Sequence, residues 1–228
     1  MLPVRVAVVG DHGVGDGDPG WVGERLEQRG ATLVPIDRER LPTYAELGAI
    51  DLLLLLGSDR SVRADPAAEA VTAEAGLLTA SLEAGVPAIG ICYGAQLAAH
   101  ALDGQVTAAV PPEIGWYQVE SADPVLCPPG PWAQYHLDAL VPPPGARVLG
   151  HSASGVQGYV TDRLVAWQFH PEVTPETLQR WIAAGPDDVA AVGADPAAVA
   201  AYSQQHRARV RSAAHRLTDA ALAHLGVA

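Results

Sequence analysis

The feature that most restricts the fold is an apolar run that ends in Gly90-Ile91-Cys92-Tyr93-Gly94, directly before a helix-forming stretch. Glycine on both sides of Cys92 removes the Cβ atoms that would obstruct a sharp turn from strand to helix. The Cys92 side chain then stands at a helix N-terminus, where unpaired amides and the helix dipole stabilise the nucleophilic thiolate. The segment therefore predicts a nucleophile elbow. The alternative is a buried cysteine that only packs.

Strand and helix signals alternate on either side of this turn, as a parallel sheet requires. Apolar periodicity predicts helices over 19–29 and 69–84, and apolar runs predict strands over 4–9, 32–36, 50–56 and 86–91. From 105 to 169 strands follow one another without a long helix, which predicts an antiparallel extension. Ligands of open parallel sheets bind beyond the carboxyl ends of the strands, where Gly57, Cys92 and His170 fall.

A candidate base for the cysteine lies at the end of the strand-like run Leu164 to His170. Side chains on a strand repeat every two residues, so His170 and Glu172 can point the same way. Pro171 between them donates no ladder hydrogen bond, which suits the exit from a strand. The pair predicts a general base and a carboxylate that orients it. A surface His-Pro-Glu turn without chemistry is the alternative.

Two segments together resemble the class I (triad-type) glutamine amidotransferases: Gly90-Ile91-Cys92-Tyr93-Gly94-Ala95-Gln96 and Gln168-Phe169-His170-Pro171-Glu172. Between them, Pro112-Glu113-Ile114-Gly115-Trp116 and Tyr135-His136-Leu137-Asp138 are similar to connecting stretches of the GMP-synthase-like branch of that family. The resemblance covers roughly residues 1–182. It implies an α/β fold with a flavodoxin-like, open, mostly parallel sheet, helices on both faces and an antiparallel extension.

The resemblance also implies the reaction. Cys92 would attack the side-chain amide of glutamine, His170 would transfer the proton, and Glu172 would fix the imidazole. A γ-glutamyl thioester and then glutamate would form, with ammonia passing to an unidentified acceptor or to a synthetase on another chain. Gln96 would help to hold the substrate. No cofactor and no metal ion is implied.

The residues around the reacting atoms depart from the family pattern in two places. The amide of Tyr93 is one expected oxyanion donor and the loop at Gly57 and Ser58 supplies the other. Ser58 and Asp59 stand where glycine and proline are usual, so this loop is expected to flip before a donor points inward.

The expected substrate-binding stretch contains Tyr135 and His136. His136 either lines the site or supports it through a hydrogen bond. Leu137 replaces the glycine that the family usually has there, which predicts a narrower pocket.

These departures leave two further functions open. One is a cysteine hydrolase that acts on another γ-glutamyl amide or peptide, which Leu137 and the altered loop at Ser58 favour. The other is a non-catalytic regulatory or binding protein with the same fold.

Charge and cysteine content restrict partners and compartment. The net charge of −12 argues against nucleic acid or an anionic membrane as partner. Cys92 must stay reduced beside the second cysteine, Cys127, and the first residues lack the features of a signal peptide, so a cytoplasmic location is expected. The segment Gly15 to Gly20 matches a dinucleotide-binding pattern, but Asp16 and Asp18 would repel a pyrophosphate. A solvated connection is predicted there instead.

The C-terminal part differs from the rest in pattern. Pro175 to Ala184 is expected to form a helix, and Gly185-Pro186 ends it. Asp195-Pro196 then begins a long amphipathic helix. We expect one amidotransferase-like domain over 1–184 and a helical extension packed on it over 185–228. The helix carries Arg207, Arg209, Arg211 and Arg216, which form either a solvated face or a docking surface for a partner or a second copy in a homo-oligomer.

Overall fold

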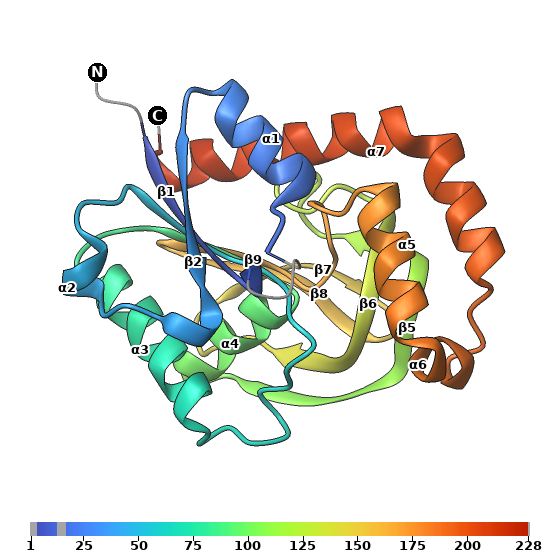
Figure 1. The fold of residues 1–228 in the computed structure, drawn as a ribbon, viewed down its shortest axis with the longest axis horizontal. Coiled ribbons are helices and arrows are strands. Elements are labelled where there is room, and N and C mark those ends of the chain that lie inside the picture. The colour runs from blue at the N-terminus through green and yellow to red at the C-terminus, as the bar shows by residue number, and fades with distance from the viewer. Residues whose placement is uncertain (1–3, 13–16, 228) are drawn as a thin grey trace.

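A computed structural model describes residues 4–12 and 17–227 (Figure 1). The described residues form one sheet of nine strands in the order β2-β1-β3-β4-β9-β8-β7-β5-β6. The strands are β1 Arg5–Gly10, β2 Thr32–Asp37, β3 Leu52–Leu55, β4 Ala88–Ile91, β5 Gln105–Ser121, β6 Gly130–Val141, β7 Arg147–Ser152, β8 Gly155–Thr161 and β9 Leu164–Trp167. The helices are α1 Gly20–Gln28, η2 (a 3-10 turn) Arg38–Arg40, α2 Tyr44–Leu47, α3 Glu69–Glu83, α4 Tyr93–Ala101, α5 Pro175–Ala184, α6 Pro186–Ala191 and α7 Pro196–Leu225.

The sheet has a parallel and an antiparallel half. β1 pairs in parallel with β2 and β3, β3 pairs with β4, and β4 pairs with β9. β9, β8, β7, β5 and β6 then pair in antiparallel fashion. The fold class expected from the sequence, including the antiparallel extension, is confirmed.

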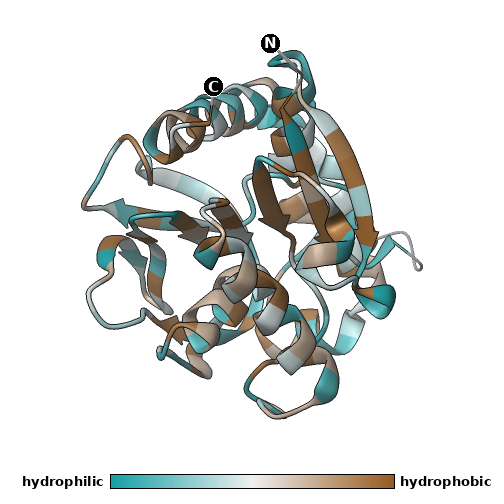
Figure 2. Cartoon of the chain, turned by 90° about the vertical axis from the view of Figure 1, so that its left-hand side faces the viewer, coloured by the Kyte–Doolittle hydropathy of each residue, from teal (hydrophilic) through white to brown (hydrophobic). Residues whose placement is uncertain are grey.

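Helices cover both faces of the parallel half (Figure 1). The side chains of β3 alternate between two hydrophobic clusters, because successive residues of a strand point to opposite faces. Leu52 and Leu54 pack with residues of α1 and α7 on one face, and Leu53 and Leu55 pack with residues of α3 and α4 on the other. Figure 2 shows the hydrophobic residues of the strands enclosed between these helical layers.

The predicted helices agree with the observed ones to within a few residues at each end. The prediction over 19–29 corresponds to α1, the one over 69–84 to α3, and the one over 175–184 to α5. Two short helices, α2 and α6, were not predicted because four to six residues carry too little periodicity.

The long C-terminal helix begins and ends as its sequence indicates. The Asp195 side chain accepts hydrogen bonds from the backbone amides of Ala197 and Ala198, and the left-handed Gly226 follows its last turn. Its buried residues Leu217, Ala221 and Leu222 belong to the same hydrophobic cluster as residues of α1. Residues after α5 thus contribute to the main core.

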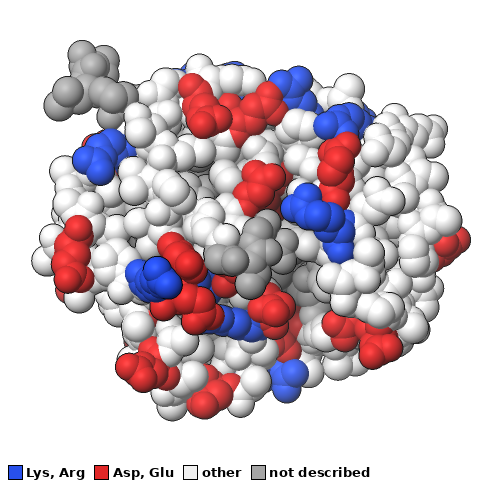
Figure 3. All heavy atoms as spheres, viewed as in Figure 1, with Lys and Arg blue, Asp and Glu red and all other residues white. Residues whose placement is uncertain are grey.

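Part of the predicted solvated connection at Gly15 to Gly20 lies outside the described residues. None of the helices within the described part of the chain has the length and apolarity needed to cross a bilayer. On the face seen in Figure 3, Lys and Arg side chains stand in separate groups among more widespread Asp and Glu side chains.

Candidate active site

The turn from β4 into α4 holds Cys92 in an unusual backbone conformation. Its φ of 50° lies in the left-handed region, which residues with a Cβ atom rarely adopt. The two flanking glycines are required by close contacts: a Cβ on Gly90 would lie 2.8 Å from the Gly94 oxygen, and one on Gly94 would lie 2.3 Å from the Leu55 oxygen. The sequence therefore enforces a sharp turn that presents Cys92 at the N-terminus of α4.

His170 and Glu172 follow β9, the strand beside β4, and form a close pair. His170 Nδ1 lies 2.6 Å from Glu172 Oε1, and both side chains are buried. Burial by itself lowers the pKa of His170, but the charges of Glu172 and Cys92 outweigh it and raise the pKa to about 10. His170 Nε2 has no hydrogen-bond partner among the described residues. The ring is thus held at Nδ1 and free to exchange a proton at Nε2.

A pair of buried glutamines contacts the Cys92 sulfur from the other side. Gln168 Nε2 donates to Cys92 Sγ at 3.6 Å, and Gln168 Oε1 accepts from Gln96 Nε2 at 3.2 Å. Gln96 Nε2 lies also 3.3 Å from the carbonyl oxygen of Asp138. The side-chain nitrogen of Gln96 therefore has two acceptors, Gln168 Oε1 and the Asp138 oxygen, and its side-chain oxygen can accept a hydrogen bond from a further donor.

These side chains border one cavity of about 480 Å³ at the carboxyl edge of the parallel strands. Asp11 follows β1, Gly57 follows β3, Cys92 follows β4 and His170 follows β9, so four strand ends contribute to its wall. The other lining residues come from the loop after β3, from β6 and from α4, α5 and α6, among them Ser58, Asp59, Arg60, Ser61, Arg63, Gln96, Trp181 and Asp188.

Two backbone amides at this edge have no acceptor within the part of the chain that the structure describes. The N–H of Tyr93 belongs to the first turn of α4, where amides have no acceptor within the helix. The N–H of Ser58 likewise has no acceptor among the described residues. An added Cβ on Gly57 would lie 2.9 Å from His170 Cε1 and 3.7 Å from Cys92 Cβ, so this loop is in contact with the catalytic candidates.

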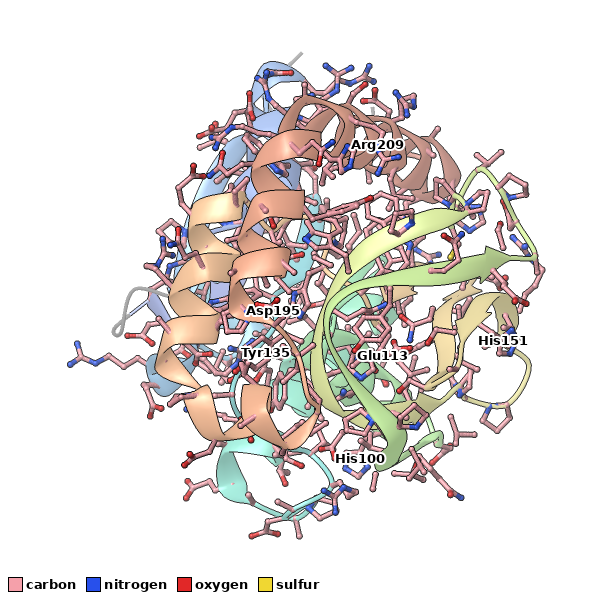
Figure 4. The ribbon with its side chains drawn as sticks, turned by 90° about the vertical axis from the view of Figure 1, so that its right-hand side faces the viewer. His100, Glu113, Tyr135, His151, Asp195 and Arg209 are labelled. Atoms are coloured by element: carbon pink, nitrogen blue, oxygen red, sulfur yellow. The ribbon has the colours of Figure 1, made fainter. Side chains whose placement is uncertain are left out.

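Of the three predicted substrate-binding residues, Gln96 lies on α4, and Tyr135 and His136 lie on β6. Tyr135 is labelled in Figure 4. Its carbonyl oxygen lies 3.7 Å from Cys92 Sγ, and its hydroxyl lies 3.5 Å from the Trp181 carbonyl oxygen of α5. His136 lines the cavity, and its ring nitrogens also lie 3.1 Å from the Asp138 oxygen and 3.5 Å from Glu113. His136 thus lines the cavity and also makes a hydrogen-bond contact with the backbone, so it combines the two placements expected from the sequence. Leu137 also lines the cavity and is 41% exposed.

Some residues of the site were not predicted from the sequence. Gln168 could have been found, because the alternation that pairs His170 with Glu172 also places Gln168 on the same side. Trp181 packs edge-on against the His170 ring with centroids 4.9 Å apart, and Arg38 binds the loop after β3. No motif signalled these two. Within 4–12 and 17–227, no group of three or more His, Cys, Asp and Glu side chains could hold a metal ion.

The family model for class-I glutamine amidotransferases matches residues 21–185. The matched region includes both the elbow and the His170–Glu172 pair and covers most of the chain. The chain belongs to the class-I glutamine amidotransferase family.

Relatives of this amidotransferase-family chain include proteins named GMP synthase. One from Thermomicrobium roseum is 43% identical over 106 residues, which are 42% of this chain and 20% of that protein. A protein from Sulfurisphaera tokodaii, named as one of the subunits of GMP synthase, is 38% identical over 96 residues, 38% of this chain and 51% of that protein. The chain thus matches only about a fifth of the first protein's length and half of the second's.

Solved structures show the same fold along nearly the whole chain. A glutamine amidotransferase from Thermotoga maritima superposes with a TM-score of 0.81 and 24% identity, covering 97% of this chain and 99% of that one. A second, from Methylobacillus flagellatus, has a TM-score of 0.79 and 23% identity over 99% and 96% of the two chains. The fold, including α7, is therefore shared by separate amidotransferase chains.

Proposed function

We propose that this chain hydrolyses the side-chain amide of glutamine through a thioester on Cys92. One observation carries the proposal: Cys92, in a left-handed backbone conformation at a helix N-terminus, shares a cavity wall with His170, whose other ring nitrogen lies 2.6 Å from Glu172. This is the arrangement of nucleophile, base and orienting carboxylate that amide hydrolysis requires. Membership of the amidotransferase family supports glutamine as the substrate.

In the first step the Cys92 thiol transfers its proton to His170 Nε2. The raised pKa of His170 favours the protonated ring, since the Glu172 carboxylate stabilises its positive charge. The thiolate then attacks the amide carbon. The backbone of Cys92 fixes the direction of attack, because the turn leaves the side chain few orientations.

The tetrahedral intermediate carries its negative charge on the former amide oxygen. We assign the amide of Tyr93 and an amide of the Gly57–Ser58 loop as its hydrogen-bond donors. Gly57 and Ser58 line the cavity, and Tyr93 directly follows Cys92, which lines it as well. Neither the Tyr93 nor the Ser58 N–H has another acceptor among the described residues. Loss of one such donor typically lowers the rate about a hundredfold or more.

Collapse of the intermediate breaks the carbon–nitrogen bond. His170 donates its proton to the leaving nitrogen, which departs as ammonia and leaves the γ-glutamyl thioester on Cys92. Water then attacks the thioester, with His170 as base, and glutamate leaves. Glu172 keeps the imidazole in one orientation throughout.

The cavity offers several groups for the amino-acid end of the substrate. The side-chain oxygen of Gln96 can accept a hydrogen bond from the α-ammonium group, because its amide nitrogen is already engaged. Tyr135, His136 and Leu137 also line the cavity, and we propose that the leucine side chain narrows it. These residues therefore limit the size of any group attached to the amide nitrogen or to the α-amino group of the substrate.

We further propose that the ammonia is used by a synthetase on another chain. The relative from Sulfurisphaera tokodaii supports this, since its name describes one chain of a larger GMP synthase assembly. The residues of the cavity do not indicate which molecule accepts the nitrogen of the released ammonia.

A second candidate is hydrolysis of another γ-glutamyl amide or peptide by the same chemistry. Leu137 supports it, since its side chain changes the wall of the cavity. A comparison of kcat/KM for glutamine with that for γ-glutamyl amides and dipeptides, measured as glutamate release, tests both. The proposal predicts the highest value for glutamine. A conjugate favoured over glutamine would establish the second candidate, and no release from any of them would reject both.

A further inference from the structure

Arg38 is a fully buried charge that the reaction described above does not use. It begins the 3-10 turn after β2, and its side chain is 0% exposed. Its Nε donates to both carboxylate oxygens of Glu74, at 3.2 and 3.0 Å, and its Nη1 donates to Asp11 at 2.7 Å. Burying a guanidinium is costly unless its partners are well placed. Two carboxylates therefore hold the Arg38 side chain in one position.

The remaining contacts of Arg38 are with the candidate oxyanion region. Its Nη2 donates to the Leu56 carbonyl oxygen at 2.9 Å, and its Nη1 donates to the Gly57 carbonyl oxygen at 3.2 Å. Its guanidinium carbon lies 4.9 Å from the centroid of the Tyr93 ring. Arg38 thus contacts both segments to which an oxyanion donor was assigned.

Because the peptide group is planar, the position of the Gly57 carbonyl oxygen also determines the direction of the Ser58 N–H. In a trans peptide the carbonyl and the following N–H point to opposite sides. With the Gly57 oxygen held at Arg38, the Ser58 N–H points away from Arg38. Gly57 borders His170 and Cys92 on the cavity wall, and the Ser58 N–H has no acceptor among the described residues.

We infer that Arg38 is a positioning residue, which holds the Gly57–Ser58 peptide so that the Ser58 N–H faces the cavity as an oxyanion donor. Because Arg38 binds the carbonyl oxygens of Leu56 and Gly57, the loop does not have to flip to present the Ser58 N–H. Glu74 and Asp11 act indirectly, because they hold the Arg38 guanidinium that binds the loop. The inference rests on the proposed hydrolysis of an amide at Cys92.

The test compares the wild-type protein with the double variant Arg38→Met/Glu74→Gln, which removes both fully buried charges and leaves Asp11, whose side chain is 12% exposed and lines the cavity. The matched control is Arg25→Met/Asp219→Asn, because that pair joins α1 to α7 and lies outside the cavity wall. Three quantities are measured: kcat and KM for glutamine, and the rate at which iodoacetamide alkylates Cys92. Alkylation passes through no oxyanion, so it reports on the thiolate alone.

The inference predicts that kcat of the double variant falls about a hundredfold, while KM and the alkylation rate stay within about threefold. The control retains the wild-type values. A kcat within threefold of wild type would overturn the inference. A parallel loss of kcat and alkylation would also overturn it, because it would show a general disturbance of the cavity.

Ser58→Pro removes the assigned N–H directly and should lower kcat similarly. Added to the double variant it should cost little more, since both changes remove the same donor. Full additivity would contradict the inference. If the double variant fails to fold, Arg38→Lys replaces it, because lysine keeps the charge but lacks the planar set of donors.

A crystal structure of the double variant, or of Arg38→Lys, separates this inference from the proposed function. It should show the Gly57–Ser58 peptide rotated from its present direction. An unmoved peptide overturns the role of Arg38 whatever the activity. If wild-type protein releases no glutamate from glutamine, the proposed function fails, and the direction of the peptide still decides what Arg38 does.

Discussion

The two cysteines of this chain are both buried and belong to the same hydrophobic cluster, but their polar neighbours and their backbone conformations differ. Cys92 is 4% exposed and Cys127 is 0% exposed. Cys127 lies before β6 among the hydrophobic residues of the main core, and burial, with a smaller contribution from Asp123, raises its pKa to about 12. Cys92 instead receives a hydrogen bond from Gln168 and shares its cavity with the His170–Glu172 pair.

The contrast shows that burial alone does not distinguish a reactive cysteine from an inert one. Burial disfavours a thiolate at Cys127, whereas Cys92 has the Gln168 amide as a hydrogen-bond donor and shares its cavity with His170. The backbone differs as well, because only Cys92 occupies a sharp turn at a helix N-terminus. The predictions below test which of these differences matters.

The largest effect is expected from removal of each sulfur in turn. Cys92→Ala should lower kcat for glutamine on the order of 10⁴-fold or more, since the nucleophile is lost. Cys127→Ala should leave kcat within about twofold, because only a core contact is lost. Steady-state glutamate release measures both. Equal losses in the two variants would remove the distinction between the cysteines.

The next effect concerns the carboxylate of the His170–Glu172 pair beside Cys92. Glu172→Gln keeps the shape of the side chain but removes its charge, and should lower kcat about 10³- to 10⁴-fold. KM for glutamine should change little, since Glu172 lies behind His170. Unchanged kcat in this variant would show that Glu172 has no part in orienting the ring.

The titration of His170 gives a further test. Its folded-state pKa of about 10 lies above the ordinary 6.5, so this group stabilises the fold fully below pH 6.5, and the contribution is lost as the pH rises toward 10. NMR of the labelled ring should show a titration near pH 10 in wild type and a lower one in Glu172→Gln. The free energy of unfolding should correspondingly fall less steeply over that range in the variant. Titration at an ordinary value in wild type would contradict the ion-pair description.

A smaller effect is expected from the glutamine beside the sulfur. Gln168→Met removes the donor at 3.6 Å from Cys92 and should lower kcat roughly tenfold, as expected for a hydrogen bond to a charged group. Gln118→Met, on β5 outside the cavity wall, is the matched control and should show no loss. Equal behaviour of the two glutamine variants would mean that Gln168 only packs.

The fold could be predicted because its signals are local. The continuous apolar run of β3 and the periodicity of α3 each lie within one segment, and their alternation determines a parallel sheet. The turn at Cys92 was predictable for the same reason, since its glycines are adjacent in sequence. The spacing of His170 and Glu172 could be interpreted from strand alternation.

Contacts between distant segments could not be predicted in this way. Gln168 meets Cys92 across 76 positions, and Arg38 meets Glu74 across 36. The sequence neighbours of Arg38 do not distinguish it from an ordinary surface arginine. Alternation could have placed Gln168 on the side of His170, but it does not indicate a contact with Cys92. The contacts of Arg38 with the Leu56 and Gly57 carbonyl oxygens join distant segments as well, so the sequence alone did not include them when it predicted a loop that flips.

The central claim is that Cys92, and not Cys127, is the nucleophile toward a glutamine side chain. Labelling with a diazo-ketone analogue of glutamine, followed by mass-spectrometric peptide mapping, tests it most directly. The account predicts modification at Cys92 alone, slowed by added glutamine and absent in Cys92→Ala. Modification of Cys127, or labelling that persists in Cys92→Ala, would contradict it.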